Sequence, residues 1–94
     1  MRFEWDENKN KTNRDKHGVS FETAQLVFND PHALSVQDRH ECGEERWQTL
    51  GLVGGVVMLL VAHTYTERGD AEVIRIISAR KATKREKQRY EQAR

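Results

Sequence analysis

The chain contains a single cysteine, Cys42, and a single proline, Pro31, among its 94 residues. One cysteine cannot form a disulfide within the chain, so a disulfide scaffold is excluded and we expect a reducing, cytoplasmic location. We expect no secretory signal, because charged residues follow Met1 at once. The longest uncharged run, 50–66, contains three glycines and is shorter than the roughly 18–20 apolar residues that span a bilayer. Transmembrane placement is therefore excluded.

Motifs for nucleotides and metals are also missing. Neither a GxGxxG string nor a P-loop occurs. Of the residues that could bind zinc, only two lie close together, and they form no CxxC or HxxxH pair: His17, His32, His40, Cys42 and His63. We therefore expect no cofactor and no metal site.

The sequence is rich in charge, at 33% of its residues, with 36% hydrophobic residues. This length and composition predict one folded domain, residues 1–94, with a modest core. Residues 18–74 carry three Lys or Arg against nine Asp or Glu, whereas residues 75–94 carry eight against two. The basic C-terminal segment indicates either a polyanion partner or a solvated helix face.

The N-terminal third is predicted to be mostly helical. Residues 2–5, "RFEW", form a first strand or a strand-like lead-in, and Asp6 then caps a helix over roughly 7–16 that Gly18 ends. This helix has no apolar residue, so no apolar stripe of its own holds it. Ser20 caps a second helix, "FETAQLVF", whose apolar face consists of Phe21, Ala24, Val27 and Phe28.

The remainder is predicted to form an antiparallel meander and a last helix. Turn sequences, including "RGD" at 68–70, separate four strand-like runs: 33–37, 46–53, 56–66 and 72–79. The third run lacks alternation, which predicts a central strand covered on both faces. Thr83 and Glu86 form a capping box for a helix over roughly 84–93.

The predicted fold class is therefore α+β. It comprises two N-terminal helices, a three- to four-stranded antiparallel sheet and a C-terminal helix.

Two long segments of the chain resemble the BrnT family of bacterial type II toxins: "FEWDENKNKTNRDKHGVSFETAQLVFNDP" and "IRIISARKATKREKQRYE". The family pattern also includes "GEERW" between them, in the same order and spacing. The resemblance implies a RelE-like fold and a cytoplasmic endoribonuclease of the mRNA interferase type that arrests growth. It also implies a BrnA antitoxin, a ribbon-helix-helix protein, in a heterotetramer or higher complex that binds promoter DNA.

RNA cleavage without a metal needs a base near the ribose 2′-OH, an acid near the leaving 5′-oxygen and cations around the phosphorane. Arg75 stands within the apolar run "VIRIIS", and Arg80 follows that run. A guanidinium is always charged and matches phosphate geometry, so we predict that both contact RNA. The alternative for Arg75 is a salt bridge to a carboxylate such as Glu44 or Asp30, or an extended side chain at a sheet edge.

With that implied activity, the catalytic candidates are His17, Glu44, Arg46, Arg75 and Arg80. Histidine as a residue type titrates near neutral pH, so His17 is a candidate acid or base, or else a residue that satisfies helix C-terminal carbonyls. Glu44 is a candidate base that shares a strand face with Arg46, or the two form a surface pair.

The candidates for RNA binding are Lys9, Asn13, Lys16, Lys84 and Tyr90. The first three share one helix face. Lys16 alternatively complements the helix dipole. Tyr90 either stacks on a base or packs in the core.

Two other function classes remain open. One is a non-catalytic interaction module whose basic C-terminal region binds nucleic acid or a protein partner. The other, an antitoxin-type DNA reader, is disfavoured because no ribbon-helix-helix or helix-turn-helix pattern occurs. Cleavage of RNA by the purified protein would distinguish the enzyme from the module. For a toxin, we expect the antitoxin to mask the cationic surface.

Overall fold

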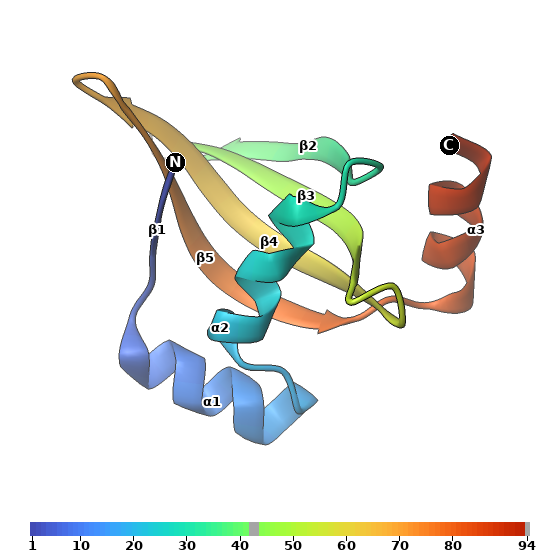
Figure 1. Ribbon diagram of the computed structural model, residues 1–94. Coiled ribbons are helices and arrows are strands. Elements are labelled where there is room, and N and C mark those ends of the chain that lie inside the picture. Colours follow the sequence, from blue (N-terminus) through green and yellow to red (C-terminus); the bar gives the residue numbers. More distant parts are fainter. Residues whose placement is uncertain (42–43, 94) are drawn as a thin grey trace.

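The structure, a computed structural model, describes residues 1–41 and 44–93, with side chains described for 1–38 and 45–93. A twisted sheet carries helices on one face, and the C-terminal helix lies apart from them at one end of the sheet (Figure 1). In chain order the elements are β1 (Arg2–Glu4), α1 (Glu7–His17), α2 (Phe21–Ala24), the 3-10 helix η1 (Gln25–Asn29), β2 (Leu34–Glu41), β3 (Glu44–Val53), β4 (Val57–Arg68), β5 (Ala71–Lys81) and α3 (Lys84–Ala93).

The sheet has the strand order β1-β5-β4-β3-β2. Strands β2 to β5 form the predicted antiparallel meander, and β4 is the central strand as predicted. The prediction of a three- to four-stranded antiparallel sheet is wrong, because β1 adds a fifth strand that pairs in parallel with β5. Its partner lies at the opposite end of the sequence, so no hairpin signal could reveal the pairing.

Alternation along β4 defines two faces of the sheet. The helical face carries Leu59, Val61, His63 and Tyr65, and the main core lies between it and α1, α2 and η1. The open face carries Met58, Leu60, Ala62 and Thr64, and α3 packs against one end of it.

The boundaries of α1 confirm the sequence prediction. Asp6 is the N-cap, and its Oδ1 accepts the N–H of Asn8 at 2.8 Å and that of Lys9 at 3.3 Å. Gly18 ends the helix in the left-handed conformation, with φ of 73°, and its N–H donates to the Arg14 carbonyl at 2.8 Å.

Two buried asparagines attach this wholly polar helix to the rest of the fold. Nδ2 of Asn13 donates to the carbonyls of Val19 and Ala79, each at 2.8 Å, and its Oδ1 accepts the Ala79 N–H at 3.2 Å. Oδ1 of Asn10 accepts the Phe21 N–H at 2.8 Å. Buried side-chain amides therefore replace the missing apolar stripe.

The predicted second helix is α-helical only over Phe21–Ala24 and continues as η1. Ser20 caps it as predicted, with its Oγ accepting the Thr23 N–H at 3.1 Å. The side chain of Val27 is fully buried against β3. Gly51 permits this approach, because a Cβ there would lie 2.9 Å from Cγ1 of Val27.

The C-terminal helix α3 is held by a capping box and by Tyr90. The Thr83 N–H donates to Oε1 of Glu86 at 2.8 Å, and the Glu86 N–H donates to Oγ1 of Thr83 at 3.2 Å, as predicted. The Tyr90 ring is 2% exposed and packs with Leu50 and Met58.

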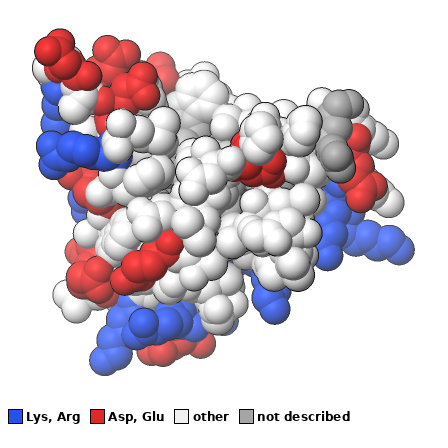
Figure 2. All heavy atoms as spheres, viewed as in Figure 1, with Lys and Arg blue, Asp and Glu red and all other residues white. Residues whose placement is uncertain are grey.

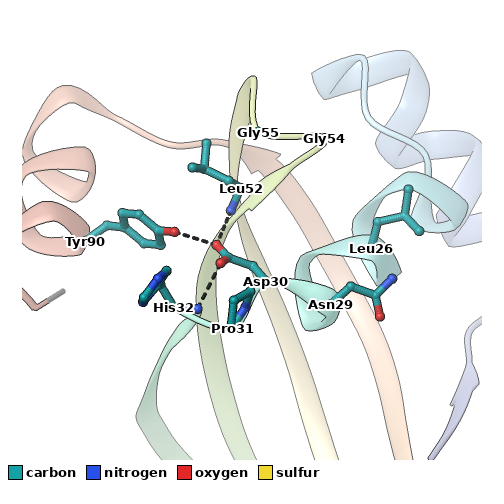
Figure 3. A pocket seen from close by; sticks show the side chains of 9 residues that line it. All are labelled: Leu26, Asn29, Asp30, Pro31, His32, Leu52, Gly54, Gly55 and Tyr90. Carbon is teal, nitrogen blue, oxygen red and sulfur yellow. Dashed lines mark hydrogen bonds between the residues drawn. The ribbon is translucent and has the colours of Figure 1, made fainter.

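Asp30 joins α3 to the sheet. Figure 3 shows its carboxylate between three donors from different parts of the chain. Oδ2 accepts the Tyr90 hydroxyl at 2.6 Å and the Leu52 N–H at 2.8 Å, and Oδ1 accepts the His32 N–H at 2.9 Å.

The "RGD" sequence lies at the β4–β5 turn as predicted, with Gly69 at a φ of 61°. Within residues 1–41 and 44–93, the helices are all too short or too polar to cross a membrane.

Candidate active site

Two arginines flank one threonine across the open face. Arg46 of β3 is paired with Thr64 of β4, and Thr64 is paired with Arg75 of β5. Directly paired residues on antiparallel strands point to the same face with Cβ atoms about 4.5–5.5 Å apart. Thr64 is only 4% exposed although α1 and α2 lie on the other face, which indicates that neighbouring side chains shield it. The register thus places two guanidinium groups within reach of one anion.

Arg75 has a carboxylate partner that differs from the two considered from the sequence. Its Nη1 lies 4.0 Å from Oε1 of Glu4, on the neighbouring strand β1. The same oxygen accepts a shorter bond, 3.0 Å, from Arg68. Asp30, by contrast, is bonded to Tyr90 and to backbone N–H groups. Because the Arg75 side chain is 45% exposed and its ion pair is long, an incoming anion can compete for it.

Arg80 forms a much closer ion pair. Its Nη1 and Nη2 donate to the two carboxylate oxygens of Glu86 at 2.8 and 2.9 Å. The hydrogen bond from Arg80 holds the pKa of Glu86 down at about 2, and the same bond raises the pKa of Arg80. The pair fixes α3 to the end of β5, and its charge is neutralised locally. A direct contact between Arg80 and phosphate would therefore require Glu86 to be displaced.

A hollow of about 340 Å³ between α1 and β5 is lined by four further candidates. Lys9, Asn13, Lys16 and His17 line it from α1, and Ile77 and Ser78 line it from β5. The register between β4 and β5 shifts at Ile77, which is the extra residue of a bulge. Ser78 is paired with Ala62 and lies on the open face between the positions of Arg75 and Arg80. The hollow therefore adjoins the row formed by Arg46, Thr64 and Arg75.

Two of the predicted RNA-binding residues belong to the fold instead. Asn13 is 6% exposed, and its amide joins α1 to β5. Tyr90 is 2% exposed, with its ring in the open-face core and its hydroxyl on Asp30. Direct contact with RNA would compete with these bonds, so the structure gives both residues a role in the fold. Packing in the core was the alternative considered for Tyr90 from the sequence. For Asn13, the lack of apolar residues in α1 was the one sequence signal that a polar side chain must attach this helix.

For the last two candidates, Lys84 and Glu44, the structure says little about a role in the site. Lys84 is exposed as the first residue of α3. The side chain of Glu44 lies outside the described residues, so its prediction has no structural test.

Sequence reasoning missed the neutral polar residues of the open face. Thr64 lies between Arg46 and Arg75. Two residues along β4, Ala62 lies in the same way between Gln48 of β3 and Ser78 of β5. No motif marks them; only the strand register reveals their position. Among the side chains of 1–38 and 45–93, no group of three or more His, Cys, Asp or Glu residues is placed to hold a metal ion.

The fold and this surface define a class: a small α+β protein with a cationic row across one face of a mixed sheet. A family model described as the ribonuclease toxin BrnT of type II toxin-antitoxin systems matches residues 5–86, and the chain therefore belongs to this family. The resemblance predicted from the sequence is confirmed. Family membership makes the protein a ribonuclease toxin of a type II system, with RNA as substrate and an antitoxin as partner.

A crystal structure of the Brucella abortus ribonuclease toxin BrnT has a similar fold. The TM-score is 0.67 at 24% sequence identity, and the match covers 89% of this chain and 99% of that chain. No curated protein matches the sequence.

Proposed function

We propose that this protein is a metal-independent endoribonuclease that cleaves messenger RNA on the open face of its sheet and thereby arrests growth of a bacterial cell from within the cytoplasm. The observation that carries the proposal is the row Arg46–Thr64–Arg75. Two forked cations on β3 and β5, with β4 between them, suit a dianionic phosphorane better than a single carboxylate.

In this proposal the scissile phosphate lies between Arg46 and Arg75. The ribose 2′-oxygen attacks phosphorus as a base removes its proton, the bond from phosphorus to the 5′-oxygen breaks, and an acid protonates that oxygen. The products are a 2′,3′-cyclic phosphate and a 5′-hydroxyl end. The guanidinium groups stabilise the charge that builds on the phosphorane oxygens.

His17 is the proposed acid or base, because its imidazole lines the hollow that adjoins Arg75, and histidine is the residue type that most often transfers protons in catalysis. Glu44 remains the candidate for the complementary role. Lys9 and Lys16 would contact neighbouring phosphates from α1, and Lys84 would contact the RNA near α3.

Arg80 is proposed to act in either of two ways that experiment can separate. It contacts a phosphate after exchanging Glu86 for it, or it positions α3 through Glu86. The partner is proposed to be a BrnA-type ribbon-helix-helix antitoxin, in a heterotetramer or higher complex that binds promoter DNA. This part rests on the family resemblance.

The test is RNA cleavage by the purified protein in the presence of EDTA. We expect the wild type to cut RNA and Arg75→Ala to lose about 100- to 1,000-fold in rate, the usual effect of removing one group that stabilises transition-state charge. Arg14→Ala is the matched control, because it removes an exposed cation on the α1 side that faces Glu22. A wild type that binds RNA without cutting it would instead support the non-catalytic interaction module.

A further inference from the structure

The helical face has a groove that its helices leave open. It has a volume of about 320 Å³ and crosses four strands, with walls formed by Met1, Phe28, Ser35, Trp47, His63, Tyr65 and Ile74. We call it the cross-sheet groove. The Phe28 ring borders it edge-on to His63, with ring centroids 4.9 Å apart. It lies on the opposite face from Arg46 and Arg75, and the proposed cleavage mechanism does not use it.

One polar atom of a residue that lines the groove lacks a partner. Nε1 of Trp47 is buried and has no hydrogen-bond acceptor among the residues that the structure describes. An indole N–H can only donate, so it requires an acceptor. Burial of an unsatisfied donor is costly, and a ligand that supplies an acceptor removes that cost.

His63 cannot supply the acceptor. Its Nδ1 lies 3.2 Å from the Thr64 carbonyl, and its Nε2 lies 2.7 Å from Oγ1 of Thr49. Since a carbonyl only accepts, Nδ1 carries the proton and Nε2 accepts from Thr49. Oγ1 of Thr49 is in turn 2.8 Å from Oγ of Ser35. Both ring nitrogens are thus occupied, and the chain of bonds fixes the floor of the groove.

The surroundings of the groove favour a protein segment over RNA. Its walls are almost wholly apolar and aromatic, which suits an inserted apolar side chain. By strand alternation, Glu45, Glu67 and Glu72 lie on the same face, and Glu67 and Glu72 are paired across β4 and β5. Figure 2 shows a broad uncharged area on this side, with acidic side chains gathered at the upper left over the β4–β5 hairpin, beside Lys or Arg side chains.

The acidic side chains also affect Tyr65 at the edge of the groove. Partial burial raises the pKa of the Tyr65 hydroxyl, and the charges of Glu72 and Glu67 raise it further. Phosphates would be repelled from this edge, whereas lysine or arginine side chains would be attracted.

We propose that the cross-sheet groove anchors the antitoxin. An apolar side chain next to basic residues enters the groove, and the buried Trp47 indole shifts so that its N–H donates to a backbone carbonyl of the same segment. This inference rests on the proposed toxin function and adds the surface that its partner recognises.

The position of the groove also connects anchoring with inhibition. Ser35 places one end of it at β2, and no described strand pairs with the outer edge of β2. An antitoxin chain anchored in the groove can pass around this edge and reach Arg46 on the other face. Masking of the cationic row is then a second contact of the same partner.

The test uses purified full-length toxin and the antitoxin encoded with it. Trp47→Phe keeps an aromatic ring but removes the N–H, and we expect it to weaken antitoxin binding about tenfold, the effect of one hydrogen bond to a buried donor. Glu72→Lys changes only an exposed residue and should also weaken binding. Trp5→Phe is the matched control, because Nε1 of Trp5 already donates to Glu7 at 2.6 Å. RNA cleavage by each variant alone should equal that of the wild type, which shows that it is folded.

Fluorescence of the Trp5→Phe protein, in which Trp47 is the sole tryptophan, gives a direct readout. Its emission should shift to shorter wavelength when antitoxin is added and should not change with an uncleavable RNA analogue. Wild-type affinity in both Trp47→Phe and Glu72→Lys, with unchanged emission on antitoxin binding, would overturn the groove as the anchor and leave the toxin function intact. A shift caused by RNA alone would overturn it as well. Failure of the wild type to cut RNA or to bind the antitoxin would instead refute the proposed function.

Discussion

The hydroxyl of Tyr90 donates a 2.6 Å hydrogen bond to Oδ2 of Asp30 and thereby joins α3 to the end of η1, 60 residues earlier in the chain. Burial raises the pKa of Asp30, but hydrogen bonds from the Leu52 N–H and the Tyr90 hydroxyl outweigh that effect and leave it below its ordinary value. The carboxylate is therefore ionised in the folded protein and holds α3 on the open face.

Tyr90→Phe tests this connection. We expect the free energy of unfolding to fall by about 1.5–3 kcal/mol, because the variant removes a hydrogen bond to a charged group. Urea denaturation at pH 7 measures the difference. An unchanged free energy of unfolding would show that ring packing alone holds α3.

Asn13→Ala tests the anchoring of α1. The substitution leaves the buried Val19 and Ala79 backbone groups without their partner, so we expect a loss of about 2–4 kcal/mol in the free energy of unfolding. Lys11→Ala, at an exposed position of the same helix, is the control and should stay within about 0.5 kcal/mol of the wild type. Equal stability of the two variants would contradict the assignment of Asn13 to the fold.

The Arg80–Glu86 pair predicts a dependence of stability on acid. The pKa of Glu86 is lowered to about 2, so its contribution is complete above its unfolded value of 4.5 and is lost as the pH falls from 4.5 towards 2. With Arg80 39% exposed and partly screened by solvent, we expect about 1–2 kcal/mol. Urea denaturation at pH 6 and pH 2.5 should show a smaller acid loss in Glu86→Gln than in the wild type. The same loss in both proteins would mean that the pair adds no stability.

Because His63 is buried, we expect a separate loss of stability at milder pH. Burial lowers its pKa below 6.5, so the unfolded chain binds a proton more readily than the folded one. The free energy of unfolding should therefore fall as the pH drops below 6.5, until the folded histidine is also protonated. Thermal unfolding of the wild type and His63→Gln between pH 7.5 and 5 should show this slope in the wild type only. A parallel slope in the variant would assign the effect to other groups.

Local sequence predicted the elements whose signals are local. Asp6, Gly18, Ser20 and the Thr83–Glu86 box each form bonds within a few residues, and the structure confirms all four. The meander followed from strand-like runs separated by turns, for the same reason.

The features that the sequence did not predict depend on contacts between distant segments. The pairing of β1 with β5 and the salt bridge from Glu4 to Arg75 join the two ends of the chain, and no local pattern encodes them. The approach of Arg46 to Arg75 also requires the register of three strands, β3, β4 and β5. Sequence reasoning could therefore select the arginines by chemistry, but could not show that they flank one residue.

The most direct measurement is a double-mutant cycle on Arg46 and Arg75, with kcat/KM for RNA cleavage measured in Arg46→Ala, Arg75→Ala and the double variant. If both guanidinium groups hold one phosphate, the effects are coupled, and the double variant loses less than the product of the two single losses, by a coupling of about 0.5–3 kcal/mol. Independent effects that multiply within about 0.5 kcal/mol would contradict a shared phosphate between the two arginines.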